Sequence, residues 1–216
     1  MNNTGFIIAI DGPDGSGKTT QLTLLKEWLK KKGYKIHSTR ASGGTPIGEE
    51  LRKASLSNTD RSAEVDLYIS LAMHTALGND IRKRIKNGEI VLVDRSPLSI
   101  IAYQNFGSQL KDQKSGYDAC EKMLKLWEID LLIVFNMNKF ELNVRNNRRR
   151  QTHKTETTNY YEKREPEYKQ RVVNGYKDGT RFAKRLGVRI VALDANGTIE
   201  QVYASILQTI KTSILK

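Results

Sequence analysis

Residues 12–19 read GPDGSGKT and match the GxxxxGK[ST] pattern of glycine-rich loops that wrap around phosphate groups. Glycines let such a loop turn its amide groups inward, and a helix that begins near Lys18 adds the positive end of its dipole. Lys18 is expected to reach the terminal phosphates of ATP and to act in catalysis, and the Thr19 hydroxyl to bind Mg²⁺. The motif therefore predicts an ATP site formed by Gly12, Gly15, Ser16, Gly17, Lys18, Thr19 and Thr20.

Charged residues also stand where two further strands are predicted to end. Arg40 follows the stretch 34–39, and Asp94 and Arg95 follow the apolar stretch 90–93. Parallel strands bring their carboxyl ends to one edge of a sheet, so we expect these side chains to face the phosphate loop. A carboxylate at Asp94 can hold Mg²⁺ through water, Arg40 and Arg95 suit an anionic substrate, and Arg95 is also expected to act in catalysis. The alternative for Asp94 and Arg95 is a plain surface ion pair.

A third basic group, four arginines between residues 145 and 150, precedes a polar stretch at residues 151–159. This layout is typical of a lid that closes over ATP and brings an arginine to the migrating phosphoryl group. We therefore predict a basic lid at about residues 143–162, with Arg145 at ATP and Arg149 in a catalytic role. The alternatives are a solvated cluster or a contact with nucleic acid.

The elements that must position these groups alternate between apolar strands and amphipathic helices. The pattern predicts strands at residues 6–11, 34–39, 90–93, 131–135 and 188–193. It predicts helices from Lys18 to a cap at Gly33, at residues 63–87, 98–106, 117–127 and 165–186, and from Thr198. Such alternation predicts an α/β fold of the P-loop NTPase type, with a doubly wound, five-stranded parallel sheet.

The composition is that of an ordinary globular protein, with 38% hydrophobic and 28% charged residues. A chain of 216 residues fits one domain over residues 1–216. No apolar run reaches the roughly 18 residues of a membrane span and the N-terminus lacks a signal peptide, so we expect a cytoplasmic protein. The net charge of +12 invites a nucleic-acid partner, but acidic residues share the basic helices, which favours solvated faces. Cys120 is expected to be a small buried core residue, and His37, His74 and His153 are expected to be structural or surface groups.

Longer stretches carry a more specific pattern than the phosphate loop. Residues 6–21 read FIIAIDGPDGSGKTTQ, and residues 39–48 read TRASGGTPIG, similar to TREPGGTPxG. Asp94-Arg95, Ser99 and Ala102-Tyr103-Gln104 match DR[YH]xxSxxAYQ, and residues 171–176 and 191–195 read RVVNGY and VALDA. On these stretches the sequence resembles the thymidylate kinase family over nearly its whole length, a family of P-loop nucleoside monophosphate kinases.

The resemblance implies roles for individual residues. It puts Asp14 near the acceptor's 3′-hydroxyl and Mg²⁺ in a catalytic position, Arg40 and Arg95 on the acceptor phosphate, and Tyr103 against the deoxyribose, with Gln104 also at the substrate. Family members with glycine at the Gly15 position draw a catalytic arginine from the lid. The resemblance further implies ATP and Mg²⁺ as cofactors, a nucleoside monophosphate substrate and a homodimer formed through the long helices.

Departures from the family pattern fall on the groups that read the base. The family's base-stacking phenylalanine, its base-bonding arginine and a polar base contact align with Ile69, Met73 and Ile100, all apolar. The alternative register brings Tyr68 or His74 toward the base. Apolar pockets discriminate by only about 1–3 kcal/mol, so we predict weaker or altered base selection.

The hypothesis that joins these observations is transfer of the ATP γ-phosphoryl group to a deoxyribonucleoside 5′-monophosphate, with dTMP first among the acceptors. One alternative is a deoxyribonucleoside kinase, whose related fold also favours an acidic-Arg-Ser motif such as Asp94-Arg95-Ser96. That class needs a carboxylate after the second strand, and Ala41 argues against it. The other alternative is a nucleotide- or nucleic-acid-binding protein with little kinase activity.

Overall fold

A five-stranded parallel sheet organises the molecule, as the sequence predicts. The computed structural model describes residues 5–152, 160–161 and 163–213. The strands lie in the order β2-β3-β1-β4-β5, so that β1 occupies the centre. Their bounds are β1 Phe6–Asp11, β2 Ile36–Arg40, β3 Ile90–Asp94, β4 Leu131–Asn136 and β5 Ile190–Asp194.

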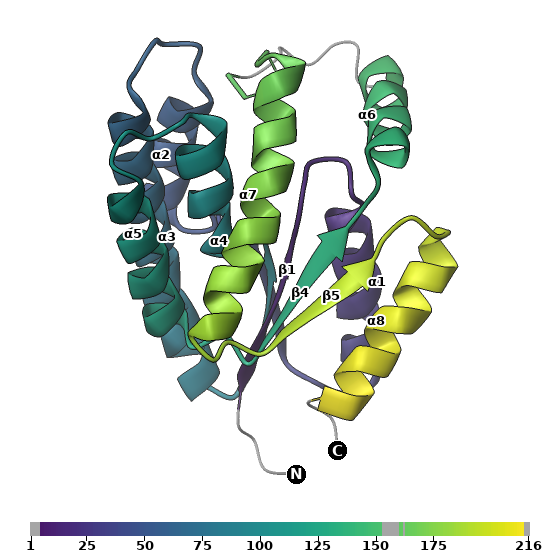
Figure 1. The fold of residues 1–216 in the computed structure, drawn as a ribbon. Coiled ribbons are helices and arrows are strands. Elements are labelled where there is room, and N and C mark those ends of the chain that lie inside the picture. The colour runs from purple at the N-terminus through teal and green to yellow at the C-terminus, as the bar shows by residue number, and fades with distance from the viewer. Residues whose placement is uncertain (1–4, 153–159, 162, 214–216) are drawn as a thin grey trace.

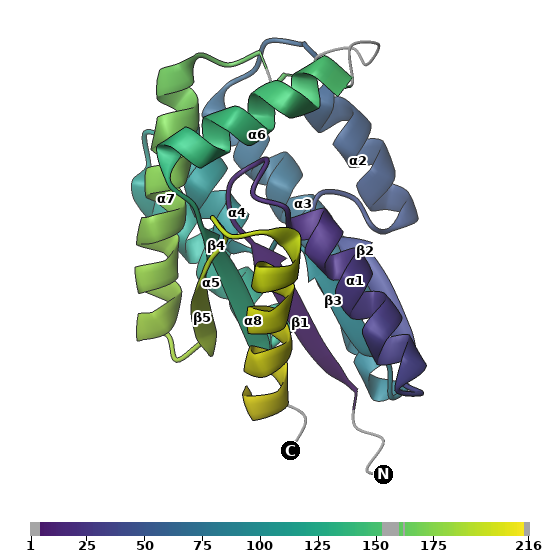
Figure 2. The same ribbon diagram turned by 90° about the vertical axis from the view of Figure 1, so that its right-hand side faces the viewer.

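Helices cover both faces of the sheet (Figures 1 and 2). One face carries α1 (Lys18–Lys31) and α8 (Ile199–Ser213). The other carries α3 (Ala63–Lys86), α4 (Leu98–Ile100), the π-helix η1 (Ile101–Gly107), α5 (Gln113–Trp127) and α7 (Pro166–Arg185). The remaining helices, α2 (Pro46–Leu56) and α6 (Lys139–Thr152), lie at the carboxyl edge of the sheet (Figure 2).

Alternation along the strands divides the core into two layers. Ile7 and Ala9 pack under α3, α5 and α7, whereas Ile8 and Ile10 pack against α1 and α8. Because strand side chains alternate between faces, a central strand covered on both sides must be apolar throughout. This explains why β1 reads as an unbroken apolar run.

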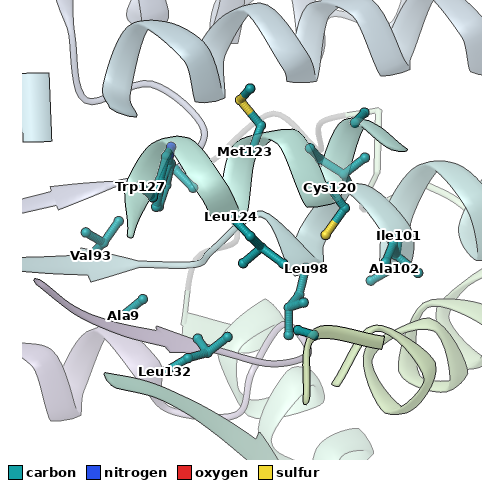
Figure 3. Packing of buried hydrophobic residues seen from close by; sticks show 14 of the residues in the cluster. Ala9, Val93, Leu98, Ile101, Ala102, Cys120, Met123, Leu124, Trp127 and Leu132 are labelled. Carbon is teal, nitrogen blue, oxygen red and sulfur yellow. The ribbon is translucent and has the colours of Figure 1, made fainter. Parts of the chain in front are cut away.

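Trp127 anchors the layer beneath α5. Figure 3 shows it on the same helix as Met123, Leu124 and Cys120, with Leu124 pointing toward the strands and Met123 pointing away from them, and all four belong to one buried cluster. Its indole Nε1 donates to the His74 carbonyl of α3 at 3.0 Å. A Cβ at Gly78 would lie 2.7 Å from the indole ring, so the glycine permits α3 to approach this closely. Cys120 is buried among these groups, and burial raises the pKa of its thiol, in keeping with a small core residue.

The stretch at residues 98–106 differs from the ordinary helix that the sequence predicts. Only Leu98–Ile100 is α-helical, and η1 continues to Gly107 with π-helical geometry. Helix α7 presses on this turn, because a Cβ at Gly175 would lie 2.6 Å from Ala102 Cα. π-helical turns are frequent at functional sites, and this one carries Tyr103.

Several element boundaries also differ from prediction, and strand β2 begins at Ile36 rather than at residue 34. Helix α5 begins at Gln113 rather than near residue 117, because the Asp112 side chain accepts from the Ser115 amide at 3.3 Å and caps the helix. Strand β5 begins at Ile190, two residues after the predicted start at Val188. Among the described residues, no helix has the length and apolar character needed to cross a membrane.

Candidate active site

Every strand of the sheet ends in a polar residue at the same edge. These residues are Asp11, Arg40, Asp94, Asn136 and Asp194. Open parallel α/β sheets bind ligands outside the carboxyl ends of their strands, where the order of connections reverses. The phosphate loop leaves the central strand β1 at this edge, so the polar strand ends surround it.

The phosphate loop is held open by its glycines. Gly12, Gly15 and Gly17 have φ angles of 139°, 83° and 90°, a region that other residues rarely adopt. Gly17 precedes the first turn of α1 and offers no side chain to cap that turn. The first amides of α1 therefore meet a loop shaped to receive an anion. Ser16 Oγ is buried without a partner among the described residues, which suits a polar ligand here.

Lys18 is buried at the start of α1. Its Nζ donates to the carbonyls of Gly12 and Pro13, both at 2.9 Å. Burial lowers the pKa of its ammonium group and Arg95 adds to this effect, whereas the carboxylates of Asp14, Asp94 and Asp11 oppose it. A cation with lowered pKa that is enclosed by the loop has the position and charge to meet a terminal phosphate.

Thr19 and Asp94 meet although 75 positions separate them in the sequence. Thr19 Oγ1 donates to Asp94 Oδ2 at 2.8 Å. A hydroxyl and a carboxylate are the hard oxygen ligands that Mg²⁺ prefers, and this ion commonly keeps waters and substrate phosphates as its other ligands. No group of three or more acidic, histidine or cysteine side chains suited to a metal occurs in the described part of the chain. The pair fits an ion held between protein and nucleotide.

Arg95 joins the phosphate loop to the far side of the cleft. Its guanidinium contacts the Asp14 carboxylate, donates to Tyr176 Oη at 2.6 Å and donates to Tyr103 Oη at 2.9 Å. Tyr103 Oη in turn donates to Asp14 Oδ2 at 2.8 Å, and burial raises the pKa of this phenol well above its usual range. Arg95 has φ of 76°, a conformation that costs energy for a residue with a side chain and that clusters at functional sites.

Beneath Arg95 lies Asp11, the fully buried end of β1. Its carboxylate accepts from the Gly12 amide at 2.8 Å, from the Ser96 amide at 2.8 Å and from Ser96 Oγ at 2.6 Å. Burial of a polar group without hydrogen bonds costs free energy, and these donors offset that cost. Asp11 thereby ties the phosphate loop to the turn that carries Arg95.

Arg40 occupies a different position from Arg95, toward α2. Its guanidinium donates to Glu49 Oε2 at 2.7 Å, and Glu49 Oε1 accepts from the Gly44 amide at 2.8 Å. Arg52 lies on the same helix and donates to the Ser42 carbonyl at 2.9 Å. Burial lowers the pKa of Arg52, with Arg40 and Arg95 both contributing, so three arginines share one positive region.

A cavity of about 320 Å³ opens on the other side of the loop, between α1, α6 and the start of α8. Arg145 lines it and donates to the Gly197 carbonyl at 3.1 Å. Arg149 belongs to α6, but its side chain lies outside the described part of the structure, as do residues 153–159 and 162 of the predicted lid. The other lining residues are Ser16, Gly17, Thr20, Gln21, Thr198, Ile199 and Val202.

Within the described part of the chain, the residues aligned with the family's base-reading groups make no polar contact with this network. Met73 is buried on α3, Ile69 is half-buried, and Ile100 is fully buried in the core. Tyr68 faces solvent, with 68% of its surface exposed. Gln104, also predicted at the substrate, is buried with Oε1 unpartnered among the described residues.

Several residues of this network are given no role by the sequence motifs. Asp11 and Tyr176 fall within the family-like stretches 6–21 and 171–176, but their contacts with the site depend on tertiary packing. Glu49 and Arg52 lie three residues apart on α2, so helical spacing after the glycine-rich loop was an available signal for them. The phenol of Tyr161, which contacts Ser55 Oγ at 3.3 Å, carried no such signal.

The fold and the phosphate-loop network place the chain in the class of P-loop nucleoside monophosphate kinases. The thymidylate kinase family matches residues 10–206. The thymidylate kinase of Exiguobacterium sp. (strain ATCC BAA-1283 / AT1b) is 33% identical over 213 residues, covering 94% of this chain and 93% of the relative. That of Gluconobacter oxydans (strain 621H) is 31% identical, covering 99% of this chain and 98% of the relative.

A solved structure, thymidylate kinase from Ehrlichia chaffeensis, has the same fold. The two align with a TM-score of 0.69 at 22% identity, over 95% of this chain and 98% of that one. The chain belongs to the thymidylate kinase family. It is a thymidylate kinase-like phosphotransferase and an ATP-dependent nucleoside monophosphate kinase, and family membership does not favour the nucleoside kinase or nucleic-acid alternatives.

Proposed function

We propose that the chain transfers the γ-phosphoryl group of ATP to dTMP, giving ADP and dTDP. The observation that carries the proposal is the network around Arg95, which links the phosphate loop through Asp14 to Tyr103 on the opposite wall. An acceptor phosphate between these walls would face Lys18. In-line transfer depends mainly on such positioning and on neutralisation of charge.

In this proposal each polar group has a separate task. Lys18 and the loop amides bind the terminal phosphates of ATP, and Arg145 lines the nucleoside end of the donor site. Thr19 and Asp94 hold Mg²⁺, which neutralises charge on the phosphates when it is bound. Arg95 and Arg40 bind the acceptor phosphate, and Arg149 is the candidate lid arginine. Asp14 and Tyr103 orient the acceptor sugar.

The base is expected to meet an apolar wall that includes Ile69 and Met73, with Ile100 and Gln104 also assigned to the acceptor side; Met73, Ile100 and Gln104 are buried. Apolar surfaces accept bases of similar shape with modest differences, about 1–3 kcal/mol. We therefore propose that dTMP is accepted together with other deoxyribonucleoside monophosphates at lower efficiency.

A coupled assay of ADP release tests the proposal. Purified protein with ATP and Mg²⁺ is offered dTMP, dUMP, dCMP, dAMP, dGMP, the ribonucleotides and thymidine, and Lys18→Ala serves as the inactive reference. Turnover of at least one deoxyribonucleoside monophosphate supports the kinase function, and dTMP as the best acceptor supports the full proposal. Turnover of thymidine alone, or of no compound, contradicts it.

We also propose a homodimer, a cytoplasmic location and one domain over residues 1–216. Val65 and Tyr68 expose 44% and 68% of their surfaces on α3, which supports contact between long helices of two copies. Sedimentation of the protein and of Tyr68→Glu tests the dimer. A monomeric wild type, or a dimer that Tyr68→Glu leaves intact, contradicts this interface.

A further inference from the structure

Helix α6, which is part of the predicted lid, contacts two different loops at the carboxyl edge of the sheet through successive residues. Arg145 donates to the Gly197 carbonyl at 3.1 Å, in the loop that precedes α8. Asn146 Nδ2 donates to the main-chain carbonyl of Asp14 at 3.3 Å, within the phosphate loop. The contact of α6 with the phosphate loop is thus made by an amide that no motif predicts.

The loop has room for this amide only because residue 15 is glycine. A Cβ at Gly15 would lie 2.3 Å from Asn146 Oδ1, far inside contact distance. At Gly17 the corresponding distance to Arg145 Nη1 is 3.7 Å, an ordinary contact. The position filled by Asn146 is thus closed to a side chain at residue 15, so the two positions are complementary.

Asp14 is held from two directions as a result. Asn146 contacts the main chain of Asp14. The Asp14 carboxylate accepts from Arg95 and from Tyr103 Oη, the latter at 2.8 Å. A carboxylate keeps its partners only if the backbone that carries it is fixed. We propose that Asn146 is a positioning residue that fixes Asp14, and through Asp14 the acceptor-side groups Arg95 and Tyr103. This inference rests on the proposed kinase function.

The first experiment compares Asn146→Ala with Asn147→Ala. Asn147 is the adjacent asparagine of the same helix and is exposed, so it controls for helix propensity and side-chain type. We expect Asn146→Ala to raise the acceptor KM about three- to tenfold, the range for one neutral hydrogen bond, with the ATP KM within about twofold of wild type. Asn147→Ala should leave both unchanged. Equal behaviour of the two variants, or an equal rise in both KM values for Asn146→Ala, would overturn the inference.

A double-mutant cycle tests whether Asn146 acts through Asp14. Tyr103→Phe removes the donor to the other side of Asp14. If both residues position the same carboxylate, the combined loss in acceptor kcat/KM is smaller than the product of the single losses. The combination of Asn147→Ala with Tyr103→Phe should be multiplicative. A multiplicative result for Asn146→Ala as well would overturn the inference.

A second cycle tests the complementarity at Gly15. Gly15→Ala is expected to displace the Asn146 amide. Adding Asn146→Ala to Gly15→Ala should therefore not raise the acceptor KM further, although Asn146→Ala alone raises it in the wild type. A rise in the acceptor KM as large as that in the wild type would contradict the proposal. Thermal unfolding of each variant verifies that it is folded. Absence of turnover in the wild type with any monophosphate would end both the function and this inference. If the wild type is active and Asn146→Ala has the same acceptor KM, only the inference about Asn146 is contradicted.

Discussion

The two walls of the cleft differ in how their side chains are stabilised. On the phosphate side, Lys18, Thr19, Asp94 and Arg95 each contact a neighbour by a directed polar interaction. On the side assigned to the base, Met73 and Ile100 are buried by apolar packing and Ile69 is half-buried. Tyr103 takes part in both kinds of interaction: its hydroxyl belongs to the polar network, and its ring packs against the buried cluster that contains Ile100 and lies edge-on to the Tyr161 ring, with 5.6 Å between the ring centroids.

This difference means that phosphoryl transfer and selection of the base depend on different parts of the cleft. Transfer of a phosphoryl group needs fixed charges at fixed places, whichever base the acceptor carries. Selection of a base needs polar groups that lose their partners when the wrong base enters, and apolar packing cannot supply that penalty. Substitutions on the phosphate side should therefore reduce turnover of every acceptor, and those on the base side should change only ratios between acceptors.

Lys18→Ala is expected to have the largest effect. It removes a buried cation that faces the site of charge development, and loss of one such group lowers kcat by about 10²- to 10³-fold. Steady-state ADP release at saturating ATP and acceptor measures it. The control is Lys30→Ala on the same helix, where the lysine is exposed and pairs with Glu27. Equal turnover of the two variants would contradict the assignment of Lys18.

Asp94→Asn should have the next largest effect, about tenfold to a hundredfold on activity, the range for groups that orient a metal site. The amide keeps the contact with Thr19 in shape but removes the negative charge. We expect the Mg²⁺ concentration for half-maximal activity to rise, and a titration with Mg²⁺ measures this. Asp60→Asn, at an exposed carboxylate, is the control. An unchanged Mg²⁺ requirement in Asp94→Asn would exclude the proposed metal role.

The phosphate side was predictable because its signals are local. The pattern from Gly12 to Thr19 predicts a loop between a strand and a helix. Arg40, Asp94 and Arg95 come at or directly after the ends of short apolar runs, so the sequence predicts their place at the edge of the sheet. Parallel pairing then brings distant residues together without further information, as with Thr19 and Asp94. The layered core followed for the same reason, since alternation in β1 assigns Ile7 and Ile8 to opposite faces.

The remainder depended on tertiary packing that no short pattern encodes. The π-helical turn at Tyr103 arises where α7 approaches Ala102, and the contact between Asn146 and Asp14 spans 132 positions. The guanidinium of Arg61, which lies 4.1 Å from the Tyr160 ring centroid, is a further case. These contacts join elements whose separation along the chain gives no periodic signal.

The base side gives a prediction of intermediate size. We expect the ratio of kcat/KM between the best and the next-best deoxyribonucleoside monophosphate to lie within about 10- to 200-fold, as for apolar pockets. Met73→Leu conserves volume and should change that ratio little. Competition between acceptor pairs in one reaction measures the ratios directly. A ratio of about 10⁴ or more would indicate polar readout of the base and would remove the contrast between the two walls.

The smallest effect concerns the stability of α3, the helix behind the base side. His74 is buried, its Nδ1 lies 2.7 Å from the Ser70 carbonyl, and burial lowers its pKa below 6.5. Between pH 6.5 and the lower folded pKa, the unfolded chain binds more protons than the folded one. The free energy of unfolding should therefore fall as pH falls through this window, by at most about 1.4 kcal/mol per pH unit for this proton.

His74→Gln isolates that contribution. The variant should be less stable at pH 7, because a buried packed ring is replaced, but its free energy of unfolding should depend less on pH between 7 and 5. His37 also has a pKa lowered by burial, so part of the slope should remain in both proteins. Urea denaturation at closely spaced pH values measures the two slopes. Parallel slopes would mean that His74 titrates normally in the folded protein, and that the base side is less enclosed than its packing indicates.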